Sequence, residues 1–216
     1  MSIKNRYEFI DKVKDIEIKQ DEYLVSFDVV SLYPNVPINT TMELLKDWFH
    51  SINLRKEEIQ DYLTLIKICM DQNVFQYKEE FYSQTEGTSM GNPLSCLLAN
   101  IFMGHFEVYA KSSLNYFPRT WLRYVDDVFT IFKKEEDIIL FTQQLNSLYP
   151  TIKFTYEIES NSCLPFLDVL VLHDENSTKL QFDIFRKPTS TFRFIPNESY
   201  HPPEQKDPPS VQWFID

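Results

Sequence analysis

Two adjacent aspartates, Asp126 and Asp127, lie between two runs of aromatic and β-branched residues within 121–132. The aromatic and β-branched residues on both sides favour strands. Asp suits a tight turn between them, because it tolerates unusual backbone angles. We therefore expect an antiparallel hairpin with two carboxylates side by side at its tip. Carboxylates beside an apolar body are costly unless something compensates them. The pair is either a solvated acidic turn or a divalent-cation site, and the second alternative needs a third carboxylate.

Asp28 is the candidate for that third carboxylate. It interrupts a nearly continuous apolar strand predicted over residues 23–30. A partnered structural acid is the alternative. If this strand pairs beside the hairpin, three carboxylates converge at one end of a sheet, where like charges cannot all stay ionised unaided. Such hard oxygen ligands suit Mg²⁺. Two Mg²⁺ ions about 4 Å apart can activate an attacking hydroxyl and stabilise a leaving oxygen in phosphoryl transfer.

Glycine is rare in the chain, with 3 residues where average usage predicts roughly fifteen. Two of them, Gly87 and Gly91, lie close together in a loop before a predicted helix whose first turn suits Pro93. Glycine lets a backbone approach a ligand closely. The loop is therefore expected to approach a ligand at Gly91, and a plain glycine-containing turn is the alternative.

The other elements alternate between helices and antiparallel strands. Helical spacing of apolar residues predicts a helix with a capping box at residues 40–43, a second from about Asn53, a long one after Pro93 and another over 138–148. Apolar alternation and runs predict strands over residues 74–77, 81–84, 152–158, 164–172 and 179–185, with a turn at 174–177. Together these elements predict an α+β sandwich, with helices packed on an antiparallel sheet.

One domain is expected over residues 23–186. Residues 1–22 are polar and charged and are expected to be a lead-in, and residues 187–216 an irregular Pro-rich end. The chain has 216 residues, 43% of them apolar and 15% aromatic. It is therefore long and apolar enough for one packed domain, or for a large piece of a bigger protein.

The composition also limits the function. The net charge of −11 argues against nonspecific nucleic-acid binding by the whole surface, but not against a nucleic-acid enzyme whose basic surfaces lie in other segments. The 3 cysteines form no CxxC pair and have no metal-binding spacing, which favours a reducing intracellular compartment. The first residues are not typical of a secretion signal. No apolar run approaches the ~20 residues that span a bilayer, so we expect no membrane partner.

The ordered motifs resemble those of one family. The chain resembles the palm domain of reverse transcriptases, and more narrowly that of Penelope-like retroelements, over most of its length. Y-V-D-D alone is a short and common motif, whereas the ordered set is specific. The matching blocks are F-D-V-V-S-L-Y-P-N-V-P at 27–37, G-T-S-M-G-N-P-L-S at 87–95 continuing to L-A-N at 98–100, Y-V-D-D at 124–127, L-P-F-L-D at 164–168 and F-R-K-P-T at 185–189.

The resemblance implies roles for the carboxylates. Asp28 and Asp126 would be the two principal metal ligands, and Asp127 the third carboxylate, nearer the primer end. The Val29 carbonyl would add an oxygen ligand. The implied cofactor is a pair of Mg²⁺ ions, with Mn²⁺ as a substitute.

The resemblance also implies substrate contacts. Tyr33 would lie beneath the incoming sugar, where its ring would clash with a ribose 2′-hydroxyl and favour a DNA product; a core tyrosine is the alternative. Met90 and Gly91 would shape the floor under the nucleotide and template base, with Ser89 and Met90 in place of the Pro-Gln of many reverse transcriptases. Lys153 would be the general acid near the pyrophosphate, or otherwise a solvated strand lysine.

The implied activity is that of an RNA-templated DNA polymerase that transfers nucleotides from dNTPs to a primer 3′-OH. The implied partners are an RNA template and a DNA primer, and the expected location is the nucleus. Fingers, thumb and endonuclease segments are not recognised, so we expect a catalytic palm fragment or a degenerate element copy. The alternatives are an inactive palm kept as a nucleic-acid or protein interaction module and an RNA-making polymerase. The intact carboxylates and Tyr33 favour the enzyme.

Overall fold

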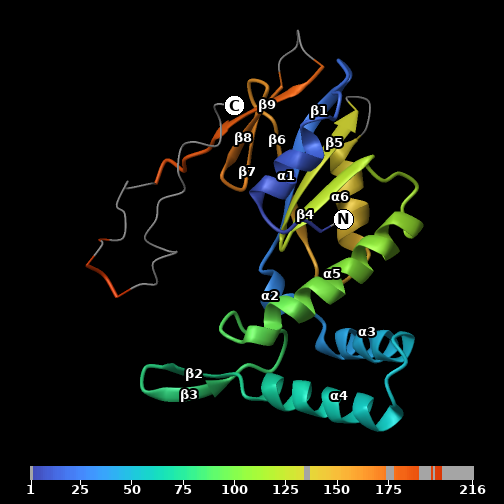
Figure 1. The fold of residues 1–216 in the computed structure, drawn as a ribbon, viewed down its shortest axis with the longest axis vertical. Coiled ribbons are helices and arrows are strands. Elements are labelled where there is room, and N and C mark those ends of the chain that lie inside the picture. Colours follow the sequence, from blue (N-terminus) through green and yellow to red (C-terminus); the bar gives the residue numbers. More distant parts are fainter. Residues whose placement is uncertain (1, 134–136, 174–177, 190–195, 197, 201–216) are drawn as a thin grey trace.

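A four-stranded antiparallel sheet forms the centre of the computed structural model, which describes residues 2–133, 137–173, 178–189, 196 and 198–200 (Figure 1). Neighbouring strands in it are antiparallel throughout. Its strand order is β4 (Thr120–Tyr124), β5 (Asp127–Lys133), β1 (Glu22–Val29) and β6 (Phe154–Ile158). The two strands that carry the predicted carboxylates, β1 and β5, are therefore the central pair.

Two helices, α5 (Pro93–Ser113) and α6 (Ile138–Ser147), cover one face of this sheet. Phe27 of β1 is 1% exposed and lies at the middle of their contact with the sheet. Its ring centroid lies 5.8 Å from that of Trp121 and 5.9 Å from that of Phe141. Because side chains alternate along a strand, the neighbours of Phe27 point to the opposite face. Asp28 is one of these neighbours.

A helix and a second sheet cover part of that opposite face. These elements are α1 (Arg6–Val13) and the three antiparallel strands β7 (Cys163–Phe166), β8 (Val169–His173) and β9 (Leu180–Ile184). The ring centroid of Phe9 in α1 lies 5.0 Å from that of Phe129 in β5 and 4.7 Å from that of Phe166 in β7. This aromatic cluster fixes α1 and the small sheet beside the central strands.

The remaining elements lie beyond α5. They are α2 (Leu32–Asn35), α3 (Ile38–Ser51), α4 (Lys56–Asp71), β2 (Val74–Tyr77) and β3 (Glu80–Ser83). Figure 1 shows α3, α4 and the β2–β3 hairpin below the central sheet, with α5 between them. Leu45 of α3, Ile59 of α4 and Leu98 of α5 share one buried cluster. The long helix α5 therefore connects this unit to the sheet.

The predicted α+β fold class is confirmed, but the capping box at residues 40–43 is wrong. The helix α3 begins earlier, at Ile38. The side chain of its cap residue, Pro37, has no atom that can accept a hydrogen bond. The Thr41 hydroxyl instead donates to the Pro37 carbonyl at 2.9 Å. A threonine that bonds back to the preceding turn lies inside a helix and is not at its start.

Two other element boundaries also differ from the prediction. The second helix begins at Lys56, three residues later than expected, because Asn53 takes a left-handed φ of 60°. The strand predicted over residues 164–172 is a hairpin of β7 and β8, and Leu167 at its turn has a φ of 56°. Apolar periodicity did not reveal either turn, because neither contains glycine or proline at the positive-φ position.

The polar start of the chain packs into the body of the protein. Phe9, Val13 and Ile18 are buried in one cluster with Leu24 of β1. The division of the chain at residues 22 and 186 stays a prediction. The expected turn at 174–177 and most of the Pro-rich end lie outside the described residues. Among the described residues, no helix combines the length and apolar character needed to cross a membrane.

The loop before α5 is held tightly against α2. Thr88 donates its backbone N–H at 2.8 Å and its hydroxyl at 3.2 Å to the Tyr33 carbonyl. Gly87 has a φ of +68°, and a Cβ atom there would lie 2.1 Å from the carbonyl oxygen of Pro34. Gly87 therefore meets a requirement for close backbone packing, and this packing places the loop beside Tyr33.

Replacement of Gly87 by alanine is expected to destabilise the protein. The Gly87→Ala variant would combine a left-handed backbone with a clash against Pro34, so the free energy of unfolding should fall by about 2–4 kcal/mol. Gly104→Ala is the matched control, because a Cβ at this helical position meets no atom within 4 Å. It should be neutral or stabilising by roughly 0.5–1 kcal/mol. Urea denaturation measures the free energy of unfolding of both variants. Equal values would contradict the close packing of this loop against α2.

Candidate active site

The pairing of β1 with β5 brings the predicted carboxylates together. Asp28 is the direct cross-strand partner of Asp127, so their side chains share one face of the sheet. The backbone N–H of Val29 donates to the Asp126 carbonyl at 3.1 Å, which ties the hairpin turn to the end of β1. The three acidic residues therefore meet at one end of the sheet, as the sequence predicted, although they come from segments almost one hundred residues apart.

The turn lies one residue earlier than the aspartate pair suggested. Val125 and Asp126 form it, and Asp127 is the first residue of β5. Val125 has a φ of 54°, and Asp126 is not among the residues with positive φ. A positive φ at the first turn residue alone is the pattern of a type II′ turn, which favours glycine at that place. Valine in this conformation is unusual and strained.

The charges of the carboxylates are only partly compensated. Burial, and then the charges of Asp126 and Asp28, raise the pKa of Asp127 to about 6, while Lys187 acts in the lowering direction. Burial and the Asp126 charge also raise the pKa of Asp28. A raised pKa of this origin means that the ionised form is disfavoured. A bound cation would relieve the repulsion.

The metal site itself is not preformed. In the described part of the chain, no three histidine, cysteine or acidic side chains are arranged to hold a metal ion. The chemistry of the donor set nevertheless fits Mg²⁺, because carboxylate oxygens converge from two strands and a turn. Repulsion among unneutralised carboxylates disfavours the close grouping of oxygens that a bound ion needs. Metal ligation by Asp28, Asp126, Asp127 and the Val29 carbonyl stays a prediction.

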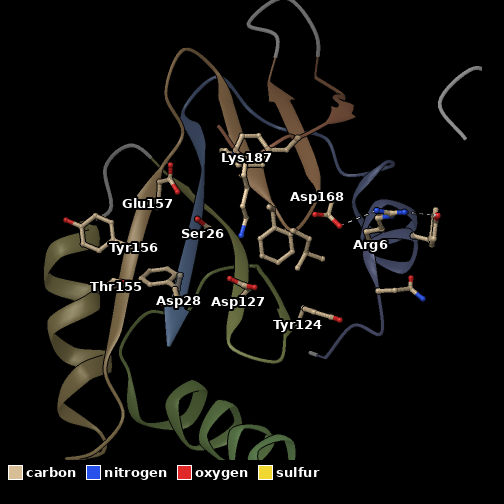
Figure 2. A pocket seen from close by; sticks show the side chains of 17 residues that line it. Arg6, Ser26, Asp28, Tyr124, Asp127, Thr155, Tyr156, Glu157, Asp168 and Lys187 are labelled. Atoms are coloured by element: carbon tan, nitrogen blue, oxygen red, sulfur yellow. Dashed lines mark hydrogen bonds and ion pairs between the residues drawn. The ribbon is translucent and has the colours of Figure 1, made fainter. Parts of the chain in front are cut away.

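An open cavity of about 870 Å³ lies next to the carboxylates (Figure 2). Asp28 and Asp127 line one side of it, and α1 and the β7–β8 turn line the other. Arg6 forms an ion pair with Asp168 at 3.2 Å across this far side. Figure 2 shows the ammonium of Lys187 directed toward Asp127. The cavity is therefore lined by four acidic residues, Asp28, Asp127, Glu157 and Asp168, and by the basic residues Arg6 and Lys187.

Sequence reasoning assigned no site role to Arg6 or Lys187. The sequence did contain a signal for Lys187, because this residue belongs to the F-R-K-P-T motif at 185–189. No signal marked Arg6, whose position beside the cavity depends on the packing of α1 against β5 and β7.

Tyr33 lies on α2, near the β4–β5 turn. Burial is the largest cause of its raised pKa, followed by the charge and hydrogen bond of the Cys96 side chain, and then by the charge of Asp126. The Tyr33 hydroxyl is thus close enough to the Cys96 side chain and to Asp126 for both to affect its pKa. The ring is partly buried against the main core cluster.

The predicted floor residues are accessible. Met90 is 78% exposed. A Cβ at Gly91 would meet no atom of the chain within 4 Å, so packing inside the protein does not require glycine there. The packing of the protein thus gives no reason for glycine at position 91. Close approach of a ligand to the backbone, which the sequence predicted there, is a reason that fits.

Lys153 is engaged away from the cavity. Its ammonium donates to the carbonyl of Asn146 at 2.6 Å and to that of Tyr149 at 3.3 Å. These carbonyls lie at the end of α6, where a cation also interacts favourably with the helix dipole. The structure does not bring Lys153 to the cavity that Asp28 and Asp127 line, and its general-acid role stays a prediction.

The chain belongs to the reverse transcriptase (RNA-dependent DNA polymerase) family, whose sequence profile matches residues 3–158. The matched range contains Asp28, Asp126 and Asp127. No curated protein sequence matches the chain significantly.

Solved telomerase structures share the fold. Apo telomerase from Candida tropicalis, truncated from its C-terminal domain, has a TM-score of 0.58 and 15% identity, over 85% of this chain and 40% of that chain. Telomerase from Candida albicans in complex with a TWJ fragment of telomeric RNA has a TM-score of 0.61 and 13% identity, over 85% and 36%. At these identities the likeness shows the fold alone. The chain spans less than half the length of these proteins.

Replacement of Asp127 by asparagine is expected to stabilise the metal-free protein at neutral pH. Because the folded-state pKa of about 6 lies above the ordinary value of 3.8, the folded protein keeps a proton that the unfolded chain has lost. Stability should therefore fall as pH rises from about 4 to 6. Asp127→Asn should remove this loss, so its free energy of unfolding at pH 7.5 should exceed that of the wild type by about 1 kcal/mol. This value is reduced from the full pKa shift because solvent screens the half-exposed side chain.

Thermal melting in a chelator at pH 4 and pH 7.5 measures this difference. The gain should be absent at pH 4, where wild-type Asp127 is protonated in the folded protein. Asp61→Asn on exposed α4 is the control and should show no gain at either pH. An Asp127→Asn protein that is less stable than the wild type at pH 7.5 would contradict the proposed charge repulsion.

Proposed function

We propose that this chain is the palm of an RNA-templated DNA polymerase from a Penelope-like retrotransposon, which transfers nucleotides from dNTPs to a primer 3′-OH. The observation that carries the proposal is the convergence of Asp28, Asp126 and Asp127 beside an open cavity. Membership of the reverse transcriptase family supports it. The narrower lineage and a nuclear place of action rest on the resemblance of the sequence motifs.

In this proposal the acidic residues hold divalent ions. Asp28 and Asp126 are the principal ligands, the Val29 carbonyl adds an oxygen, and Asp127 lies nearer the primer end. Two Mg²⁺ ions, or Mn²⁺ in their place, would activate the attacking hydroxyl and stabilise the leaving oxygen. The chain itself contributes the fixed backbone of β1 and β5, which sets the spacing of these ligands.

The substrate contacts follow from the geometry around the turn. Tyr33 is close enough to Asp126 to sense its charge, so a sugar held beside the acids would meet the tyrosine ring. Met90 and Gly91 lie on an exposed loop fixed to α2 through Thr88, where they would support the nucleotide and the template base. Arg6 and Lys187 would face the phosphates of the primer strand across the cavity.

The RNA template and DNA primer are the proposed partners. One solved relative, the Candida albicans telomerase, is in complex with a telomeric RNA fragment. The net charge of this chain is −11, and phosphate binding needs basic surface. We therefore assign most of the grip on nucleic acid to fingers and thumb segments of the whole polymerase.

A second candidate function is a non-catalytic interaction module with a palm fold. The absence of a preformed metal arrangement among the described residues favours it, because a module has no need for bound ions. The only partly compensated charges on Asp28 and Asp127 oppose it, since a structural acid is usually paired.

Primer extension tests the proposed function. The wild-type chain should extend a DNA primer on an RNA template with dNTPs and Mg²⁺ or Mn²⁺. The Asp126→Asn/Asp127→Asn variant should lose about a hundredfold or more of this activity, because it lacks the charge that holds the ions. Asp61→Asn is the matched surface control and should extend normally.

Mn²⁺ titration of the same proteins separates the remaining outcomes. Binding by the wild type that is lost in the double variant, without extension by either, would indicate a palm that needs other segments of the polymerase. If neither protein binds Mn²⁺ or extends a primer, the interaction module is the better description.

A change at Tyr33 should alter the choice of sugar. Removal of the ring in Tyr33→Ala opens space for a ribose 2′-hydroxyl, so the preference for dNTPs over rNTPs should fall by about tenfold or more. Single-nucleotide incorporation kinetics measure the ratio of kcat/KM values, with Tyr62→Ala on α4 as the control. An unchanged preference in an active Tyr33→Ala protein would show that the ring does not contact the sugar.

A further inference from the structure

Arg123 is a buried cation directly before the catalytic turn. It lies on β4 and is 1% exposed. Its Nε donates to Oε1 of Glu107 on α5 at 2.6 Å, and the Trp121 indole donates to the same carboxylate oxygen at 3.2 Å. This ion pair satisfies only one side of the guanidinium. The other side is free to bond elsewhere, because arginine presents its donors in a rigid planar fork.

The second side of the guanidinium contacts the turn. Nη1 donates to the carbonyl of Val125 at 3.0 Å. Val125 is the residue with the φ of 54°, a conformation that a β-branched residue keeps only where the surroundings hold it. The Arg123 contact acts on this residue, one position before Asp126. It therefore fixes the peptide from which the catalytic carboxylate projects.

The same nitrogen starts a second branch that ends at Tyr33. Nη1 also donates to Oδ1 of Asn100 at 3.0 Å. The Asn100 amide donates to the sulfur of Cys96 at 3.6 Å, and the Cys96 side chain lies close enough to the Tyr33 hydroxyl to raise its pKa. Cys96 and Asn100 are four residues apart on α5, so they lie on one face of this helix.

We propose that Arg123 is the positioning residue of the active site, coupling the Asp126–Asp127 turn to the sugar-facing Tyr33 through Asn100 and Cys96. The proposal rests on the proposed polymerase function for its kinetic consequences, but not for its structural ones. One guanidinium fixes both the ligands that would hold the ions and the ring that would select the sugar. A shift of Arg123 therefore moves both parts of the site.

A purely structural role is the competing explanation. A buried Arg–Glu pair is favourable only when both partners are present and the remaining guanidinium donors are hydrogen-bonded, so the contacts of Nη1 with Val125 and Asn100 also serve folding. A purely structural role predicts a loss of stability with no specific effect on the turn. Lysine separates the two roles, because its single ammonium keeps the charge opposite Glu107 but cannot reproduce the planar fork.

The chain offers a matched control for this substitution. Arg119 also pairs with a buried acid on the central sheet, donating to the carboxylate oxygens of Glu22 at 2.9 and 2.8 Å. Glu22 is 2% exposed and lies at the end of β1 opposite to Asp28. Arg119, directly before β4, is more exposed than Arg123. Arg119→Lys therefore makes the same chemical change next to the same sheet, far from the catalytic turn.

The test combines hydrogen exchange with kinetics. In Arg123→Lys, exchange of the backbone amides at residues 125–127 should become about tenfold faster, since a local hydrogen bond that restrains the turn is lost. The kcat of primer extension should fall about tenfold or more, with the KM for primer and template unchanged, because the turn is misplaced in the reacting complex. Arg119→Lys should change neither quantity, and exchange is compared at a temperature where both variants are fully folded.

Asn100→Leu isolates the second branch and leaves the Arg123–Glu107 pair intact. It should lower the dNTP over rNTP preference by about threefold or more, a size typical of small changes in pocket shape, without faster exchange at residues 125–127. It also carries the test if Arg123→Lys does not fold, because an unchanged sugar preference in Asn100→Leu would overturn the coupling.

Two outcomes distinguish this inference from the proposed function. Unchanged exchange at residues 125–127 in a folded Arg123→Lys protein would overturn the positioning role, whatever the activity. A wild-type chain that never extends a primer would count against the function, while the exchange comparison with Arg119→Lys would still decide the role of Arg123.

Discussion

The register between β1 and β5 is the constraint on which the candidate site depends. Because side chains alternate along a strand, a slip of one residue would turn Asp28 into the core and Phe27 out of it. Phe27 is held among the aromatic rings of β4 and α6, which makes such a slip costly. The hydrophobic core on one face of the sheet thus fixes the pairing of Asp28 with Asp127 on the other.

The arrangement of the site lowers the folding stability of the protein. Burial and mutual repulsion raise the pKa of both paired aspartates, and the adjoining turn keeps a valine in a left-handed conformation. Strain and partly compensated charge of this kind persist where surrounding structure holds them and where a ligand makes use of them. Here the surrounding structure is the two-sided core around the central strands and the guanidinium of Arg123.

Close backbone packing gives the other half of the site its shape. Gly87 allows the loop before α5 to touch α2, and Thr88 fixes it there with two hydrogen bonds to one carbonyl. The same helix α5 carries Asn100 and Glu107, which bond to Arg123 beside the β4–β5 turn. The loop before α5, Tyr33 and the acidic turn are thus all positioned relative to one helix.

The sequence alone determined the α+β class, most of the strands and helices, and the three carboxylates, because apolar periodicity and an ordered set of motifs are local properties of the chain. It did not reveal the hairpin at Leu167, the true start of α3, or the position of Val125 in the turn, since these depend on backbone angles that neighbouring elements impose. Arg6 and Arg123 acquire their places only when α1 and α5 pack against the sheet. Residue types and their order decided which chemistry is available, and the tertiary structure decided which groups meet, because long-range packing and hydrogen bonding are not encoded in any single segment.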